Sequence, residues 1–294
     1  MPINLIIFLI IATTVRLVLA LLFPLTADES YYWLWSKHLA LSYVDHPPVV
    51  AYLNFLFTLG QPTIFGLRLG AAFIFLLISL GLFFLARKIF NRTVAAWSVV
   101  LFQLIPHYLI VWLTMFVELP LGLFWIVSLW LLARIVKSKE AIWWYWLGLA
   151  VGLGYLSKYT MFLFWPCLLL FFYLAPAERF WLKRKEPYLS LILSLILFLP
   201  VLAWNAQHGW VSFLFHEAKI SSDAWGTSVL PFIGDQLVHF TPFLLFALWP
   251  VFRYALKKDD GSRLLFSFSF PLLLLFLLLS FCFQSIQLCL LFCV

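Results

Sequence analysis

Charged residues are scarce in this chain of 294 amino acids: only 11% are Asp, Glu, Lys or Arg, whereas 65% are hydrophobic. The mean hydropathy of +1.05 excludes a water-soluble domain. Apolar runs of about 20 residues recur along nearly the whole length, which predicts an all-α polytopic membrane protein. These runs are too continuously apolar for the alternating strands of a membrane barrel.

Cysteine is also rare, with four residues and no CxxC spacing, so no disulfide framework is predicted. No His-rich or Cys-rich spacing demands a metal ion, although a divalent metal is compatible with the acids and histidines described below. The N-terminus lacks the charged segment of a cleavable signal peptide, and we expect its first apolar run to be a membrane helix.

The apolar pattern predicts nine spans, at about 3–23, 67–86, 94–113, 116–134, 142–157, 160–177, 188–204, 229–251 and 264–281. With a cytoplasmic N-terminus, 14 of the 19 basic residues fall in the four inner connections. This distribution obeys the positive-inside rule, so the net charge of +7 indicates topology and membrane-lipid contact rather than nucleic acid. We expect an integral protein of a bacterial inner (plasma) membrane.

Acidic residues and histidines concentrate instead at the predicted outer side. The first outer connection, about 24–66, contains TADESYYWLWSKHLALSYVDHPP from Thr26 to Pro48. Asp28 and Glu29 begin a helical segment, Ser30–Leu41, whose Trp and Tyr residues suit a helix lying in the membrane surface. The acids could serve only as a helix cap that complements the dipole. Alternatively, Asp28 or Glu29 is a base or an orienting carboxylate, with Asp45 and His46 nearby.

The DE pair and the DHPP motif at this spacing, after one membrane helix, resemble the GT-C glycosyltransferases that use polyprenyl-phosphate sugars. Similar families include the lipid A galacturonosyltransferases, the aminoarabinose transferases of lipid A and the protein O-mannosyltransferases. The resemblance extends through Glu118-Leu119-Pro120-Leu121 and the break Ser157-Lys158-Tyr159. It implies an inverting transfer of a sugar to a lipid or glycan acceptor on the periplasmic face.

The resemblance also implies roles for single residues. Asp28 would be the catalytic carboxylate that accepts the proton of the acceptor hydroxyl, and Glu29 would help to place the acceptor. The second acidic position of the family falls on Glu118, where Asp is more usual. Since the donor's leaving group is a lipid phosphate, the site needs cations or hydrogen-bond donors.

Lys158 is the first candidate for the phosphate contact, with snorkelling to the interface as the alternative. Arg68 is a weaker candidate. Three histidines could also contribute, although an interfacial position alone would explain those of the later loop: His46, His208 and His216.

A transporter or flippase of lipid-linked sugars is the alternative function. It would place ionisable residues at the bilayer midplane and often has repeats. We expect one membrane domain over residues 1–281. The segment 282–294 has an atypical composition, which predicts a truncated or frameshifted product whose activity could be lost.

Overall fold

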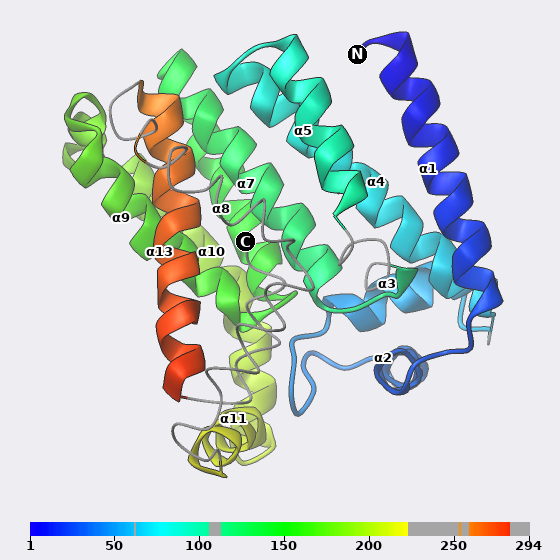
Figure 1. Ribbon diagram of the computed structural model, residues 1–294. Helices are drawn as coiled ribbons and strands as arrows, with labels where there is room; N and C mark the ends of the chain where they lie inside the picture. The colour runs from blue at the N-terminus through cyan, green and yellow to red at the C-terminus, as the bar shows by residue number, and fades with distance from the viewer. Residues whose placement is uncertain (62, 106–112, 223–252, 254–258, 283–294) are drawn as a thin grey trace.

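The computed structural model describes all residues except 62, 106–112, 223–252, 254–258 and 283–294 (Figure 1). Within the described residues every regular element is a helix, so the all-α prediction is confirmed. The α-helices and 3₁₀ helices, in chain order, are α1 (Ile3–Leu22), α2 (Ala27–Lys37), α3 (Val49–Thr58), α4 (Ile64–Ile89), α5 (Arg92–Leu104), α7 (Glu118–Ser138), α8 (Ile142–Tyr155), η2 (Tyr159–Leu163), α9 (Phe164–Leu174), η3 (Pro176–Lys183), α10 (Glu186–Gln207), α11 (Val211–Ser222) and α13 (Asp260–Cys282).

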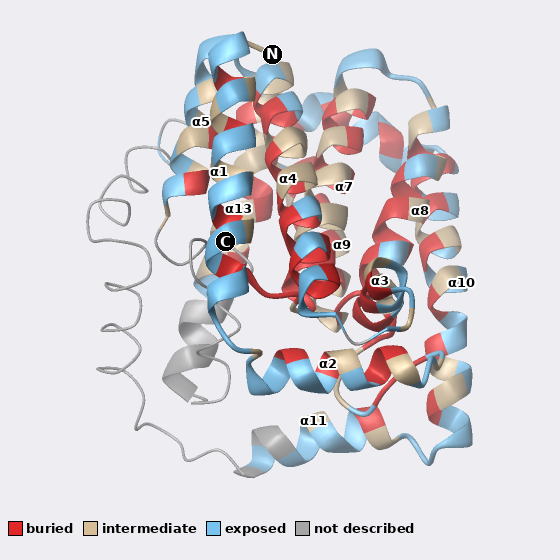
Figure 2. Cartoon of the chain, turned by 90° about the vertical axis from the view of Figure 1, so that its right-hand side faces the viewer, coloured by how far each residue is buried: buried red, intermediate tan, exposed pale blue. Residues whose placement is uncertain are grey.

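Four helices among the described residues are long and apolar enough to cross a membrane: α1, α4, α7 and α10. The outward faces of α1, α4 and α10 carry exposed apolar side chains such as Leu22, Phe84 and Leu199, whereas the apolar side chains of α7 are buried or half-buried. Figure 2 shows the exposed positions along α1 and α10. A protein in water would bury such faces, whereas lipid accepts them. The chain is therefore an integral membrane protein.

The other predicted spans have varied outcomes. Helices α5, α8 and α9 overlap predicted spans but contain only 13, 14 and 11 residues. The helix α13 covers the last predicted span, and the predicted span at 229–251 lies outside the described residues. The total of nine spans therefore remains a prediction.

Small residues allow α8 and α10 to pack closely. A Cβ atom on Gly148 would lie 2.6 Å from the backbone oxygen of Ser190, and one on Gly152 would lie 2.5 Å from Leu197 Cδ1. These two glycines are four residues apart and thus share one face of α8, as in the close helix pairs of membrane proteins.

The connections at one end of the bundle contain several short helices. The helices α2 and α11 lie across the spans rather than along them (Figures 1 and 2). The predicted helix Ser30–Leu41 is observed as α2, displaced toward the N-terminus, while α3 and α11 had been expected to be loop. Both contain apolar runs that lack a clear polar face, so their pattern did not separate a short helix from an aromatic-rich loop.

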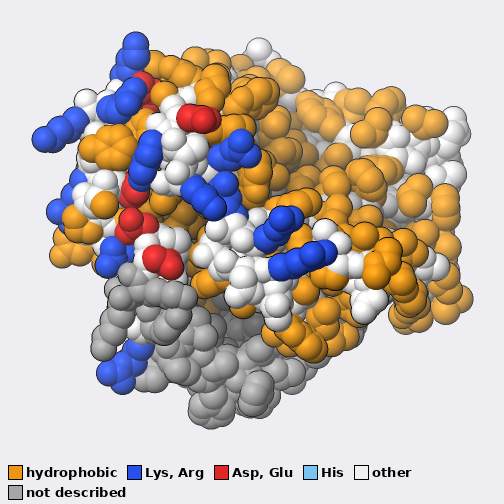
Figure 3. All heavy atoms as spheres, turned by 90° about the horizontal axis from the view of Figure 1, so that it is seen from above, with side chains coloured by type: hydrophobic (Ala, Val, Ile, Leu, Met, Phe, Trp, Pro, Cys, Tyr) orange, Lys and Arg blue, Asp and Glu red, His pale blue; other side chains and the backbone are white. Residues whose placement is uncertain are grey.

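At the opposite end, Lys and Arg side chains gather on the face seen in Figure 3. This end contains the α4–α5 connection, the α7–α8 connection and η3. Of these, η3 is a 3₁₀ helix, and its Trp181 is almost completely buried.

Candidate active site

The start of α2 is fixed by a capping box. The backbone N–H of Glu29 donates to Thr26 Oγ1 at 3.2 Å, and the backbone N–H of Thr26 donates to Glu29 Oε2 at 3.0 Å. This reciprocal pair satisfies two N–H groups that a helix start leaves open. Successive residues of a helix point in different directions, and here Asp28 is exposed while Glu29 is buried.

Glu29 also forms a buried ion pair with Arg68 of α4. Glu29 Oε1 lies 2.9 Å from Arg68 Nη1, and each side chain is only 1% exposed. The same guanidinium donates to the backbone oxygens of Leu113 at 3.0 Å and Pro24 at 3.1 Å. Burial raises the pKa of the Glu29 carboxyl, which Thr26, Arg68 and the backbone of Met115 oppose. Arg68, a candidate phosphate ligand from sequence, thus lies against Glu29.

The loop after α2 folds back onto that helix. Trp35 and Tyr43 stack with ring centroids 4.2 Å apart, and the Tyr43 hydroxyl is 3.0 Å from the backbone oxygens of Trp35 and His38. Burial raises the pKa of the Tyr43 phenol to about 12, so this hydroxyl keeps its proton. The Tyr31 hydroxyl donates to Asp45 Oδ1 at 3.1 Å, which brings Asp45 back to the first turns of α2.

Tyr32 lies within electrostatic reach of three candidate acids. Burial raises the pKa of its phenol, and the negative charges of Glu118, Asp45 and Asp28 raise it further. Tyr32 follows Asp28 by four residues, so the two lie on one face of α2. The outer loop, α2 and the start of α7 therefore contribute carboxylates to the same neighbourhood.

Lys158 and Glu118 form the second buried ion pair. Lys158 Nζ lies 2.7 Å from Glu118 Oε1, and the side chains are 7% and 11% exposed. Lys158 has an extended backbone between α8 and η2, so the break predicted there is confirmed. The DHPP segment leads directly to this break, because the N–H of Val49, the first residue of α3, donates to the backbone oxygen of Leu156 at 3.0 Å.

Two of the three candidate histidines join this neighbourhood. The rings of His46 and His216 have centroids 6.3 Å apart, and His216 Nε2 is 3.0 Å from the Asp45 backbone oxygen. His216 also meets Tyr159 edge-on at 5.6 Å. His208 differs, since it is exposed and stacks on Trp204 at 4.0 Å.

We define the outer cluster as the six residues Asp28, Asp45, His46, Glu118, Lys158 and His216. Tyr32 and Tyr159 lie beside it. From sequence, Tyr32 was expected only as an interfacial aromatic and Tyr159 only as part of the break at Ser157-Lys158-Tyr159. The four-residue spacing of Tyr32 from Asp28 was the sequence signal that could have placed Tyr32 beside the candidate acid. Within the described ranges, no three His, Cys, Asp or Glu side chains are grouped so that they could hold a metal ion.

Residues 45–204 match the family model described as dolichyl-phosphate-mannose-protein mannosyltransferase, which is more than half of the chain. The chain belongs to this family. The predicted resemblance to GT-C glycosyltransferases is thereby confirmed. The matched range of the family includes Asp45, His46, Glu118 and Lys158, whereas Asp28 and Glu29 precede it and His208 and His216 follow it.

The chain is also similar to the lipid A galacturonosyltransferase RgtD of Rhizobium johnstonii (strain DSM 114642 / LMG 32736 / 3841). The two are 26% identical over 257 residues, which cover 84% of this chain and 54% of RgtD. The chain thus spans about half the length of this curated relative. No solved structure matches the chain.

Proposed function

We propose that the chain transfers a sugar from a polyprenyl-phosphate carrier to a lipid A, core or related glycan acceptor. The observation that carries this proposal is the convergence of three carboxylates and Lys158 at one end of the helices, in a member of a mannosyltransferase family. The similarity to a lipid A galacturonosyltransferase favours a glycolipid acceptor.

In the proposed reaction, the acceptor hydroxyl oxygen attacks the anomeric carbon of the sugar. The bond from that carbon to the phosphate oxygen breaks, and the phosphate leaves on its lipid. Asp28 takes the proton of the hydroxyl, because it is the exposed acid of the DE pair and therefore open to an acceptor. A single displacement of this kind inverts the anomeric configuration.

Lys158 is the cation that we assign to the leaving phosphate. A buried ammonium next to Glu118 is held in one position, so its charge is already oriented when negative charge develops on the phosphate. The imidazoles of His46 and His216, together with Asp45, would contribute hydrogen bonds to the sugar or phosphate.

Glu29 has a different part in this proposal. Its two carboxylate oxygens contact Thr26 and Arg68, so it positions the first turn of α2 and with it Asp28. We therefore treat Glu29 as a positioning residue rather than as a second base. His208 has no role in the proposed chemistry, since its described contacts are with Trp204.

We infer that the outer cluster faces the periplasm of a bacterial inner membrane. The inference follows from the basic residues at the opposite end, which the positive-inside rule assigns to the cytoplasm. A sugar donor that presents its phosphate at the outer surface would then meet the cluster from the lipid side.

The test uses membranes that contain the full chain, a radiolabelled polyprenyl-phosphate sugar and extracted lipid A as acceptor. Asp28→Asn should abolish labelled product while expression is unchanged, because the amide cannot accept the proton. Glu217→Gln is the matched control, since it removes one exposed acid from α11 at the same end of the protein. Turnover by Asp28→Asn at the rate of this control would refute the assignment. Movement of donor across the membrane without product would instead support a flippase.

A further inference from the structure

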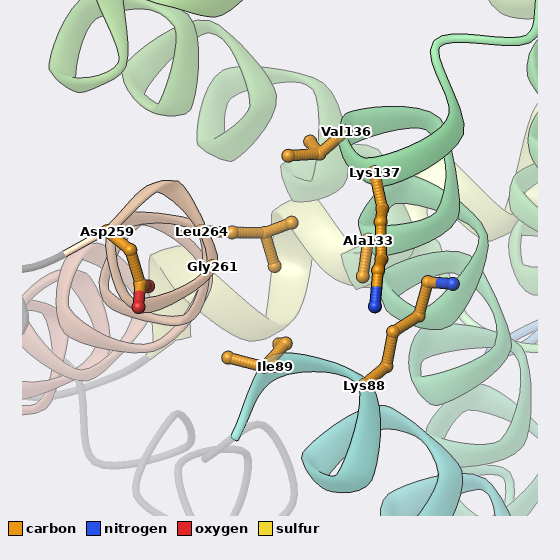
Figure 4. Close-up of a pocket in the computed structure, with 8 residues that line it drawn as sticks. All are labelled: Lys88, Ile89, Ala133, Val136, Lys137, Asp259, Gly261 and Leu264. Carbon is orange, nitrogen blue, oxygen red and sulfur yellow. The ribbon is translucent and has the colours of Figure 1, made fainter. Parts of the chain in front are cut away.

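A second polar site lies at the end of the bundle away from the outer cluster. A cavity of about 190 Å³ opens between the ends of α4 and α7 and the start of α13. Its residues include Lys88, Ile89, Lys137, Asp259 and Leu264 (Figure 4). A water molecule in the liquid occupies about 30 Å³, so the cavity is large enough to hold a phosphate group.

The cavity carries positive charge on one side. Figure 4 shows the Lys88 and Lys137 side chains together, with Asp259 across the cavity. Arg134 and Lys137 both act on Lys88 through charge repulsion, so three cations share this corner. Arg134 packs over the ring of Trp143, with its guanidinium carbon 4.2 Å from the ring centroid, which fixes its position beside the lysines.

Three acids at this end of the protein form ion pairs with residues outside the cavity lining. Among the described residues, Glu178 pairs with Lys139, Glu186 with Arg184 and Asp260 with Arg263.

Asp259 accepts the backbone N–H of Ser262 at 2.8 Å and so caps the start of α13. In the part of the chain that the structure describes, neither Lys88 nor Lys137 forms an ion pair. The two lysines therefore face the cavity without an ion-pair partner among the described acids, and Asp259 is the one acid among the lining residues.

The remaining walls are apolar, since Ile89, Ala133, Val136 and Leu264 line the same cavity. A site with two ammonium groups, hydrocarbon walls and a position at the ends of membrane helices matches an amphiphile with an anionic head. Basic pockets between membrane helices on the cytoplasmic side bind phospholipid head groups through this combination.

We propose that this cavity binds the phosphate of an anionic phospholipid from the leaflet at this end of the bundle. Lys88 and Lys137 hold the phosphate oxygens, and the apolar walls contact the glycerol and the first acyl carbons. The site is separate from the outer cluster, and it does not depend on the proposed transferase activity.

The experiment measures binding of phosphatidylglycerol to the purified, delipidated full chain in neutral detergent by native mass spectrometry. Phosphatidylcholine and inorganic phosphate are the comparison probes. Lys88→Gln/Lys137→Gln should weaken phosphatidylglycerol binding by about 25-fold, since each lysine near an anionic head group contributes about fivefold. Lys183→Gln/Lys185→Gln is the matched control, because it removes two exposed cations from the same end outside the cavity.

The charge-conserving variant Lys88→Arg/Lys137→Arg should keep the affinity. If the double glutamine variant does not fold, the single glutamine variants replace it, each with about a fivefold loss. Equal losses in the cavity and control variants would overturn the proposal. Equal binding of phosphatidylcholine would also overturn it, because apolar contact alone would then explain binding. Displacement of the lipid by inorganic phosphate would overturn it too, because the ligand would then be a soluble anion.

Discussion

Removing the positive charge of Arg68 should strongly destabilise the protein. Arg68 and Glu29 are each 1% exposed and 2.9 Å apart, so Arg68→Met leaves a buried carboxylate without its cation. Breaking such a pair from one side costs about 3–5 kcal/mol in the free energy of unfolding. Glu29→Gln should have a similar effect, although glutamine at this position can preserve the capping box. Unfolding by sodium dodecyl sulfate in mixed micelles, followed by circular dichroism, measures these free energies.

The double variant Arg68→Met/Glu29→Gln separates the ion pair from other effects. We expect it to be about 2–3 kcal/mol more stable than the sum of the single losses, because neither charge is then left alone. The pair of Arg263 and Asp260 is the control: its distance is also 2.9 Å, but its side chains are 29% and 28% exposed. Coupling there should be about 0.2–1 kcal/mol. If the free-energy loss of the double variant equals the sum of the losses of Arg68→Met and Glu29→Gln within about 0.5 kcal/mol, the buried pair is refuted.

Three further predictions concern other parts of the protein. Lys158→Met should lower the free energy of unfolding by about 3–5 kcal/mol, because it leaves Glu118 buried without its cation, and it should abolish sugar transfer. The double variant Lys158→Met/Glu118→Leu should recover stability but not transfer. Recovery of both stability and transfer would contradict the phosphate role of Lys158. Because burial raises the pKa of Glu29 above its ordinary value of 4.5, the folded state holds this proton more tightly. The free energy of unfolding should therefore fall as the pH rises from about 4.5 through the raised pKa, and a Glu29→Gln variant with the same slope would contradict this. Gly152→Leu should separate α8 from α10 and lower the free energy of unfolding by about 1–3 kcal/mol. Leu153→Ala, at an exposed position, should lower it far less. A larger loss for Leu153→Ala than for Gly152→Leu in thermal unfolding would exclude the close packing.

Much of the architecture could be predicted from sequence because lipid imposes simple constraints. Apolar length alone located α1, α4, α7 and α10, since a span needs about 20 apolar residues. The Ser157-Lys158-Tyr159 break was visible because polar residues interrupt two apolar runs. The helices α3 and α11 were missed, since hydrocarbon content does not distinguish a short helix lying in the interface from a loop with many aromatics.

The candidate site was predictable as a set of residues but not as a set of contacts. Asp28, Asp45 and Glu118 were expected at one surface, and the charges that act on Tyr32 agree with that neighbourhood. The partner of Glu29 could not be foreseen, because Arg68 is 39 positions away on a different helix and sequence offered it only as a phosphate ligand. Pairing across helices depends on side-chain direction, which periodicity does not give.

The shortness of α8 has a consequence for how a substrate reaches Lys158. A helix of 14 residues is about 21 Å long, whereas the hydrocarbon layer is about 30 Å thick. The chain turns back after these 14 residues, and the ammonium of Lys158 lies just past the turn, buried against Glu118. Under the proposed function, an isoprenoid phosphate that reached this charge from the bilayer would keep its tail in lipid, so the energetic cost of moving that hydrocarbon into water would be avoided.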